Sequence, residues 1–291
     1  MRPALALLAM ILLACLLAPV YAAHISGTDP FRTNVLGQVN GADVLAESPA
    51  GIGTMPIGPA WRGPYLLGAD ALGRDVAARL LYGGRTSLLV AGAATLLCLA
   101  LGAAAGTLAG AFAGAVDSVM SAVLDLLWAF PVTLLAICLS LALLAGPLQL
   151  GPLMVQEDSL LLPILVLGLV YAPYVARPVR AALVDLRTAP FIEAARATGG
   201  NPFHILRRHL LPQLVPLLSG LAPIVAAMML LTEAALSVLG LGVQQPGASW
   251  GTLIADGQNL LHERPIVAIA PGLAVAATVL ALNAVAERLR D

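Results

Sequence analysis

Few side chains in this sequence could do chemistry in an apolar setting, and two of them are carboxylates. Asp125 and Glu233 each lie near the middle of a long apolar segment. A bare carboxylate in a hydrocarbon environment costs roughly 2.5 kcal/mol or more, so such groups normally face a bundle interior or a water-filled path. For both residues we favour a role in helix packing, and a place along a water-filled path is the alternative.

The residue types that are missing narrow the chemistry further. All fifteen basic side chains are Arg, and the chain has no Lys. This excludes a GxxxxGK[ST] phosphate-binding loop and any Schiff-base or Lys general-base mechanism. Any nucleotide-driven process would therefore need a second chain to hydrolyse the nucleotide. We expect no catalytic residue and no cofactor in this chain.

The histidines and cysteines do not indicate a site either. The four histidines have no ligand spacing among themselves or with cysteine, so no metal site is expected. The three cysteines lie inside apolar segments, which indicates small core residues rather than a disulfide framework. These cysteines are Cys15, Cys98 and Cys138.

The composition says what must surround these residues. Hydrophobic residues make up 59% of the 291 residues and charged residues only 11%, and the mean hydropathy is +0.91. A soluble domain cannot hide that much apolar surface, so lipid is the solvent for most of the chain. The net charge of -1 and the lack of a basic patch with interleaved aromatics give no sign of a nucleic-acid partner.

Hydropathy predicts an all-α membrane protein with six transmembrane helices. The first covers residues 3–23, long enough to cross a hydrocarbon core of roughly 30 Å. The run ending at Cys15 resembles a lipoprotein signal box, and residues 20–22 resemble a signal-peptidase site. Because the apolar run continues past Cys15 into a polytopic chain, we favour an uncleaved helix. The other five spans are Ser87–Phe112, Ser118–Leu144, Ser159–Ala176, Gln213–Leu239 and Ile266–Ala286.

Residues 24–84 are polar and rich in Gly and Pro, so we expect them to lie in water outside the cytoplasmic membrane. They have too little apolar periodicity to build a core of their own. Near their end, residues 66–90 are predicted to form an amphipathic helix along the membrane surface. Its expected polar face consists of Asp70, Arg74, Asp75 and Arg79.

The distribution of arginine predicts the orientation. Six arginines fall in residues 177–212 and two more near the C-terminus, whereas the short loops of the opposite side carry only Arg264. The positive-inside rule then places 177–212 and both termini in the cytoplasm. Residues 24–85 hold five arginines, but that loop is at the length limit where the rule fades. The six arginines of residues 177–212 are Arg177, Arg180, Arg187, Arg196, Arg207 and Arg208.

The cytoplasmic stretch 188–212 has the local signals of a helix, a glycine break and a second helix. Thr188 is the expected N-cap of a helix over 189–198, which Gly199 and Gly200 stop. Asn201 and Pro202 then restart a helix. The small side chains before the break leave the backbone bare, which suits close insertion into a groove on a partner.

This stretch resembles the EAA loop by which permeases of ABC importers dock on their ATPase subunits. The family pattern usually has Ile where His209 stands, although the peptide-permease branch tolerates His, and Gln213 stands where that branch often has Asn. The resemblance implies that this loop couples the chain to ATPases. The matching residues are Glu193, Ala194, Ala195, Gly199, Leu211 and Pro212.

Two further motifs resemble the dipeptide and oligopeptide permeases, so the likeness covers roughly residues 62–290. They are the Gly, Asp and Arg pattern over 68–83 and the Ser249-Trp250-Gly251 triplet, whose Trp also suits a membrane interface. The resemblance implies a MetI-like type I importer fold. It also implies a second permease chain, two ATPases and an extracytoplasmic binding protein. We divide the chain into a first helix at 1–23, an extracytoplasmic segment at 24–84 and a permease core at 85–291.

The cargo and one packing surface stay open. Peptides are the favoured cargo, and nickel complexes and glutathione are alternatives within the family. An ion-coupled carrier that uses Asp125 and Glu233 is less favoured, and a non-transporting receptor is ranked last. Glycines repeat every fourth residue from Gly102 to Gly114, a pattern that favours close helix contact in lipid, either within the chain or with a second permease subunit.

Overall fold

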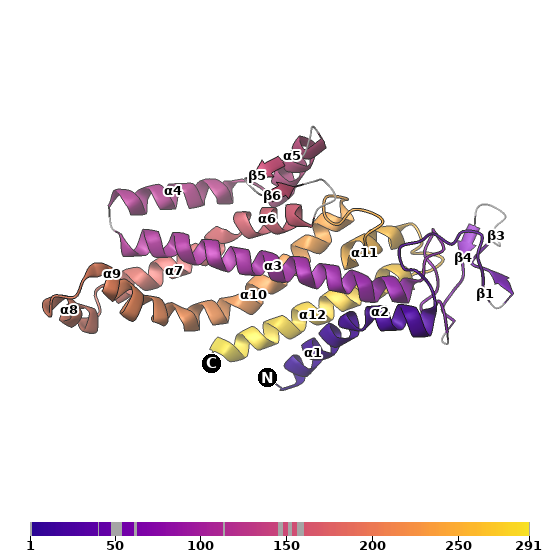
Figure 1. Ribbon diagram of the computed structural model, residues 1–291, viewed down its shortest axis with the longest axis horizontal. Helices are drawn as coiled ribbons and strands as arrows, with labels where there is room; N and C mark the ends of the chain where they lie inside the picture. The colour runs from indigo at the N-terminus through magenta and orange to yellow at the C-terminus, as the bar shows by residue number, and fades with distance from the viewer. Residues whose placement is uncertain are drawn as a thin grey trace.

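The chain folds into an elongated helix bundle, seen here in a computed structural model that describes residues 2–39, 41–47, 54–60, 63–112, 114–144, 148–150, 153–155 and 160–290. Two short helices form one end of the bundle, and two β-hairpins lie at the other end (Figure 1). The start of α1 and the end of α12 lie near each other, close to the middle of the long axis (Figure 1).

The helices in chain order are α1 (Arg2–Leu16), α2 (Ala18–Tyr21), η1 (Ala22–Ser26), α3 (Val76–Ala111), α4 (Ala115–Ala129), α5 (Val132–Leu144), α6 (Leu161–Val170), α7 (Ala172–Leu186), α8 (Pro190–Ala197), α9 (Pro202–Ile205), η2 (Leu206–Leu210), α10 (Leu211–Val238), α11 (Trp250–Gln258) and α12 (Ile266–Arg290). The π-helix η1 follows α2 without a gap, and the π-helix η2 joins α9 to α10 without a gap. Antiparallel pairs form between β1 (Gln38–Val39) and β2 (Ala42–Asp43), between β3 (Leu45–Glu47) and β4 (Thr54–Pro56), and between β5 (Leu148–Leu150) and β6 (Leu153–Val155).

The predicted six spans are not all single helices. Within the described residues, four helical stretches are long and apolar enough to cross a membrane, and a fifth is counted if α1 and its continuation through α2 and η1, bent by 51°, form one span. The span predicted at 118–144 is divided into α4 and α5 at Phe130, whose backbone is extended before Pro131. A residue before proline is sterically pushed out of the α region, which explains the break. The predicted start at Ser159 lies outside the described residues.

Three of the glycines that repeat every fourth residue from Gly102, which we call the glycine ladder, form a helix contact within the chain. A Cβ built at Gly102 would lie 2.7 Å from the carbonyl oxygen of Ala172, and one at Gly106 would lie 2.5 Å from that of Ala176. A Cβ at Gly110 would lie 2.7 Å from Cβ of Leu183. Three turns of α3 therefore rest directly on the backbone of α7, which decides between the two packing interpretations of these three glycines.

Replacing Gly106 by alanine should destabilise this contact by about 1–3 kcal/mol, because two helix backbones must separate to admit one methyl group. Gly92 lies on the same helix with nothing within 4 Å of its would-be Cβ. Gly92→Ala should therefore be stabilising by up to about 1 kcal/mol through helix propensity alone. Thermal unfolding of the two purified variants in detergent measures both effects, and equal melting temperatures would contradict the contact.

The amphipathic helix predicted over 66–90 is wrong in its first half. Gly68 and Gly73 have positive φ values of 84° and 70°, and the chain forms turns up to Asp75. Asp75 then caps α3 by accepting hydrogen bonds from the backbone amides of Ala77 and Ala78 at 2.9 and 3.2 Å. An aspartate in this position is a strong N-cap. From Val76 onward the helix continues into the bundle rather than along its surface.

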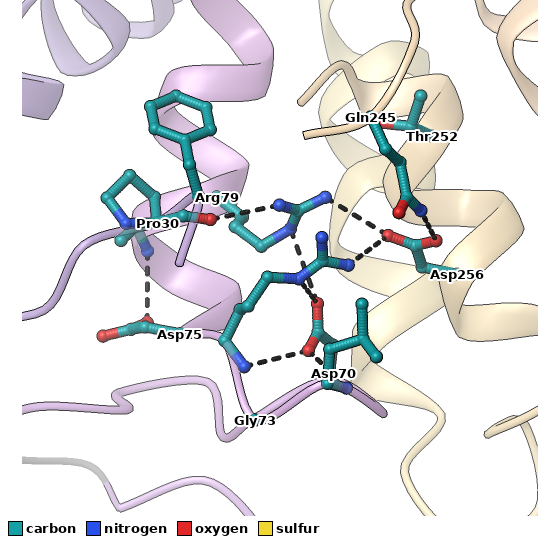
Figure 2. A network of polar contacts seen from close by, with 12 residues as sticks. Pro30, Asp70, Gly73, Asp75, Arg79, Gln245, Thr252 and Asp256 are labelled. Atoms are coloured by element: carbon teal, nitrogen blue, oxygen red, sulfur yellow. Dashed lines mark hydrogen bonds and ion pairs between the residues drawn. The ribbon is translucent and has the colours of Figure 1, made fainter. Parts of the chain in front are cut away.

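The charged residues of this segment are buried rather than solvated, which corrects the predicted polar face. Arg74 Nε donates to Asp70 Oδ2 at 2.7 Å, and both Arg74 and Arg79 reach Asp256 Oδ2 on α11, at 2.9 and 3.2 Å. Arg79 also donates to the carbonyl oxygen of Pro30 at 3.1 Å. Figure 2 shows the guanidinium group of Arg79 between Asp70 and Asp256. We call Asp70, Arg74, Arg79 and Asp256 the ionic clasp.

The segment between η1 and α3 also builds a small core, contrary to expectation. Val44, Tyr65 and Ala69 form a buried cluster. Tyr65 has a positive φ of 62°, a costly conformation for a bulky residue. Its hydroxyl donates to the carbonyl oxygen of Gly73 at 3.0 Å and accepts from Asn34, while its amide donates to Asp75. These bonds hold the strained residue in place, and burial raises the pKa of the Tyr65 phenol.

Candidate functional site

The stretch from α8 to the start of α10 forms the predicted helix, break and helix, and we call residues 188–212 the elbow. Gly199 has a φ of +81°, which only glycine adopts readily, and it ends α8. The Asn201 side chain accepts a hydrogen bond from the amide of Phe203 at 2.9 Å, so it is the predicted N-cap of α9. Thr188 is not a cap. Its hydroxyl donates to the carbonyl oxygen of Asp185 at 2.9 Å, and Ala189 accepts the first bonds of α8.

The two glycines of the break have different roles. Nothing lies within 4 Å of a Cβ built at Gly199, whereas one built at Gly200 would lie 2.6 Å from the carbonyl oxygen of Ala195. The amide of Gly200 donates to that same oxygen at 3.0 Å. Gly199 therefore supplies the backbone conformation of the turn, and Gly200 allows the chain to fold back tightly against α8.

The inner face of the elbow is anchored in the bundle core. Ile192 is fully buried, and Ile205 and Leu210 are 4% exposed. All three belong to the main hydrophobic cluster, which also contains Leu183 of α7 and Leu214 of α10. Because these anchors lie on α8, α9 and η2, a displacement of the elbow has to carry the core residues with it.

The outer face of the elbow carries most of the predicted docking residues. Glu193, Ala194 and Gly199 are exposed, and Ala195 is half-buried against the core. Leu211 and Pro212 are exposed as well, at the first two positions of α10. The structure thus places the first three on α8 and in the break after it, and the last two where the elbow becomes a long helix.

A cavity beneath the elbow, and the arginine that borders it, were not predicted from the sequence. A cavity of about 550 Å³ lies between the end of α3 and the second half of the elbow. Arg187 donates to the carbonyl oxygen of Gly110 at 2.9 Å and so ties the entry of the elbow to α3. No local pattern marks this contact, because the two residues are far apart in the chain. Other lining residues include Phe112, Pro202, Phe203 and Leu206.

The predicted arginine-rich loop is shorter than expected. Helix α7 continues to Leu186, so Arg177 and Arg180 lie on a helix. Each pairs with an acid of α4. Arg180 makes two hydrogen bonds to Asp117, at 2.6 and 2.7 Å, and Arg177 makes one to Asp125, at 2.8 Å.

The two candidate intramembrane carboxylates have different surroundings. The Asp125 side chain is 68% exposed on α4. Glu233 is completely buried in α10 and accepts a hydrogen bond from the Ser237 hydroxyl at 2.8 Å. Its second oxygen has no hydrogen-bond partner among the described residues. Glu233 lies inside the helix packing, and Asp125 lies on an open face of the chain.

The Ser249-Trp250-Gly251 triplet is buried between helices and does not anchor the chain at the membrane interface. Trp250 is 1% exposed, its indole N–H donates to the carbonyl oxygen of Leu80 at 3.0 Å, and its amide donates to the Ser87 hydroxyl. Ser249 and Thr252 form a reciprocal capping box at the start of α11. A Cβ at Gly251 would lie 2.5 Å from the carbonyl oxygen of Ala234, so α11 rests on the backbone of α10.

Comparisons with known proteins agree with this architecture. Residues 102–291 match the family described as binding-protein-dependent transport system inner membrane component. A peptide transport system permease protein of Brucella suis biovar 1 (strain 1330) is 36% identical over 228 residues, covering 78% of this chain and 72% of the relative. A peptide ABC transporter permease protein of Sinorhizobium fredii (strain NBRC 101917 / NGR234) is 38% identical over 224 residues, covering 77% and 72%.

A solved structure shares the fold. The MetNI methionine ABC transporter in an inward-facing conformation (CY5 native crystal form) matches with a TM-score of 0.56 at 20% identity, covering 72% of this chain and 95% of that chain. The fold is therefore MetI-like. With the family match over most of the bundle and two relatives above 30% identity, the chain belongs to the multi-pass inner-membrane permeases of binding-protein-dependent ABC importers, whose ATPase activity resides on a separate subunit.

Proposed function

We propose that this chain is a permease subunit that moves di- or oligopeptides into the cytoplasm, driven by ATPases that dock on the elbow. The peptide cargo is inferred from relatives that are named as peptide permeases. The single observation that supports the docking role is the elbow itself, where an exposed, positive-φ glycine break joins two helices anchored in the core.

The mechanism follows from the way the elbow is connected. From Pro202 to Val238 the chain is helical without interruption, so the second half of the elbow is continuous with α10. Closure of the ATPases would push the elbow, and α10 would transmit that movement to the far end of the bundle. Alternating access then consists of rocking these helices around a central path.

The proposed assembly contains four further proteins. A second, homologous permease chain completes the path, two ATPases bind the elbows from the cytoplasm, and an extracytoplasmic binding protein delivers the cargo. We place the elbow and both termini in the cytoplasm because of the arginines of residues 177–212 and of the C-terminus. Residues 1–23 are proposed as the first membrane helix, 24–84 as the extracytoplasmic segment and 85–291 as the core.

Purification of the intact complex, followed by mass spectrometry of its subunits and retained ligand, tests this proposal. We expect two ATPase chains, a second permease and a bound peptide. A retained nickel complex or glutathione would replace peptide as the cargo and leave the importer role intact. A complex with no nucleotide-binding partner, together with uptake that depends only on the proton gradient, would overturn the proposal in favour of an ion-coupled carrier.

A further inference from the structure

The face formed by α4 and α7 carries an ion pair that is open to its surroundings. Arg177 Nη2 donates to Asp125 Oδ1 at 2.8 Å, and the two side chains are 52% and 68% exposed. The guanidinium carbon of Arg177 lies 5.5 Å from the centre of the Trp128 ring. The ring centres of Trp128 and Tyr171 are 6.3 Å apart, in an edge-to-face arrangement. Two helices thus present an acid, a base and an indole side by side.

This face does not suit contact with lipid. Arg177 lies within Leu161–Leu186, a stretch apolar and long enough to span the membrane, and it is nine positions, or roughly 14 Å of helix, from Leu186. Charged groups inside a membrane-spanning segment face other protein or water, because lipid tails cannot solvate them. A dry protein interface is also unfavourable, since burying an ion pair removes its hydration. A water-filled path is the surrounding that fits best.

The pair also has unused hydrogen-bonding capacity. One turn along α7, Arg180 makes two hydrogen bonds with Asp117, and those side chains are only 38% and 24% exposed. Among the described residues, Asp125 and Arg177 share a single hydrogen bond. One carboxylate oxygen and most of the guanidinium N–H groups are therefore available, and an exposed ion pair opens at little cost because it contributes little to stability.

We propose that Asp125, Trp128 and Arg177 form a binding site for the charged ends of a peptide as it crosses the membrane. The Asp125 carboxylate would accept hydrogen bonds from the peptide ammonium group, with the Trp128 ring stabilising that cation. The Arg177 guanidinium would bind the terminal carboxylate through paired N–H donors. The inference rests on the proposed peptide importer and deepens it.

The chemistry of the site defines a class of cargo. The acid and the base together are neutral, so the site has no preference for the net charge of the side chains of a peptide. What it recognises is the main-chain ammonium and carboxylate, which every unmodified peptide has. Such a site serves cargo of varied sequence, and it would not favour a hydrated metal ion.

The test uses the complete transporter with its binding protein in proteoliposomes and trialanine as the probe. Asp125→Asn and Arg177→Gln should each lower ATP-dependent uptake by roughly tenfold to a hundredfold, the effect of losing one charge-assisted hydrogen bond. Peptide-stimulated ATP hydrolysis should stay within about twofold of the unaltered complex, because the ATPases and the elbow are untouched. The ATP hydrolysed per peptide delivered should rise accordingly.

Arg180→Gln is the matched control, because it breaks an ion pair between the same two helices without touching the site. It should change uptake and ATP hydrolysis in parallel or leave both unchanged. Unchanged uptake in both site variants would overturn the binding site, as would losses of uptake in Asp125→Asn and Arg177→Gln that match those in Arg180→Gln. Absence of ATP-dependent trialanine uptake by the unaltered complex would instead overturn the proposed peptide importer, and the site with it.

Discussion

Replacing Gly199 by glutamate should reduce uptake by at least about tenfold, equivalent to about 1.4 kcal/mol of lost coupling energy, while the protein remains inserted in the membrane. Two effects combine. A side chain at a φ of +81° costs about 1–2 kcal/mol in the turn, and a charged side chain is placed on the face that we propose inserts into the ATPase. Uptake by whole cells, with membrane levels checked by immunoblot, measures the loss.

Two control variants separate these effects. Gly240 has a φ of +76° and nothing within 4 Å of its would-be Cβ, but it follows the far end of α10. Gly240→Glu carries the same strain and charge away from the elbow, and it should retain most uptake. Gly199→Asn tolerates the left-handed backbone, so its remaining loss reports the added bulk on the docking face. Normal uptake in Gly199→Glu would contradict the docking role.

Removing the carboxylate of Asp256 should lower the free energy of unfolding by roughly 3 kcal/mol. Breaking a buried ion pair costs about 3–5 kcal/mol because a charge is left without a partner. Here two guanidinium groups, 1% and 3% exposed, lose a shared acceptor. We expect the lower end of the range since Asp256 itself is 19% exposed. Thermal unfolding of Asp256→Ala in detergent measures the change.

Asp43 offers the matched control. It is an exposed acid of the segment between η1 and α3, and among the described residues it accepts a hydrogen bond from Gln38 across the hairpin. Asp43→Ala should shift the melting temperature little, because surface polar contacts contribute well under about 1 kcal/mol. Asp256→Asn should fall between the two, as it keeps an acceptor oxygen and loses the charge. Equal melting temperatures for Asp256→Ala and Asp43→Ala would show that the clasp does not stabilise the fold.

Local signals explain why the elbow could be predicted from the sequence. The Gly199-Gly200 break, the Asn201 cap and the helix start at Pro202 depend on residues within a few positions of one another. The sequence also predicted that the glycine ladder forms a close helix contact, since glycines four apart lie on one face of a helix. The identity of the helix they contact was not predictable, because α7 lies some seventy residues away along the chain.

The ionic clasp could not be predicted for a related reason. Asp70 and Arg74 are four residues apart, which in a sequence indicates a solvated helix face with local ion pairs. Their burial depends on Asp256, a residue nearly two hundred positions later. Trp250 was misjudged in the same way, since its partner Leu80 lies on another helix. The division of the predicted span 118–144 at Phe130 was not visible in the hydropathy, which averages over a break that backbone geometry imposes.

The backbone contact between α3 and α7 limits which parts of the bundle can slide. At Gly102 and Gly106 the backbone of α3 meets carbonyl oxygens of α7 and the side chains of Val175 and Val179, which are β-branched and have few rotamers, so the two helices are joined as one body. Helix α4 is held to α7 by arginine side chains, which are long, solvated and able to exchange partners. In the proposed rocking motion, α4 would therefore slide past α7 more easily than α3 would, because partly exposed ion pairs can break and re-form while the contact between α3 and α7 cannot.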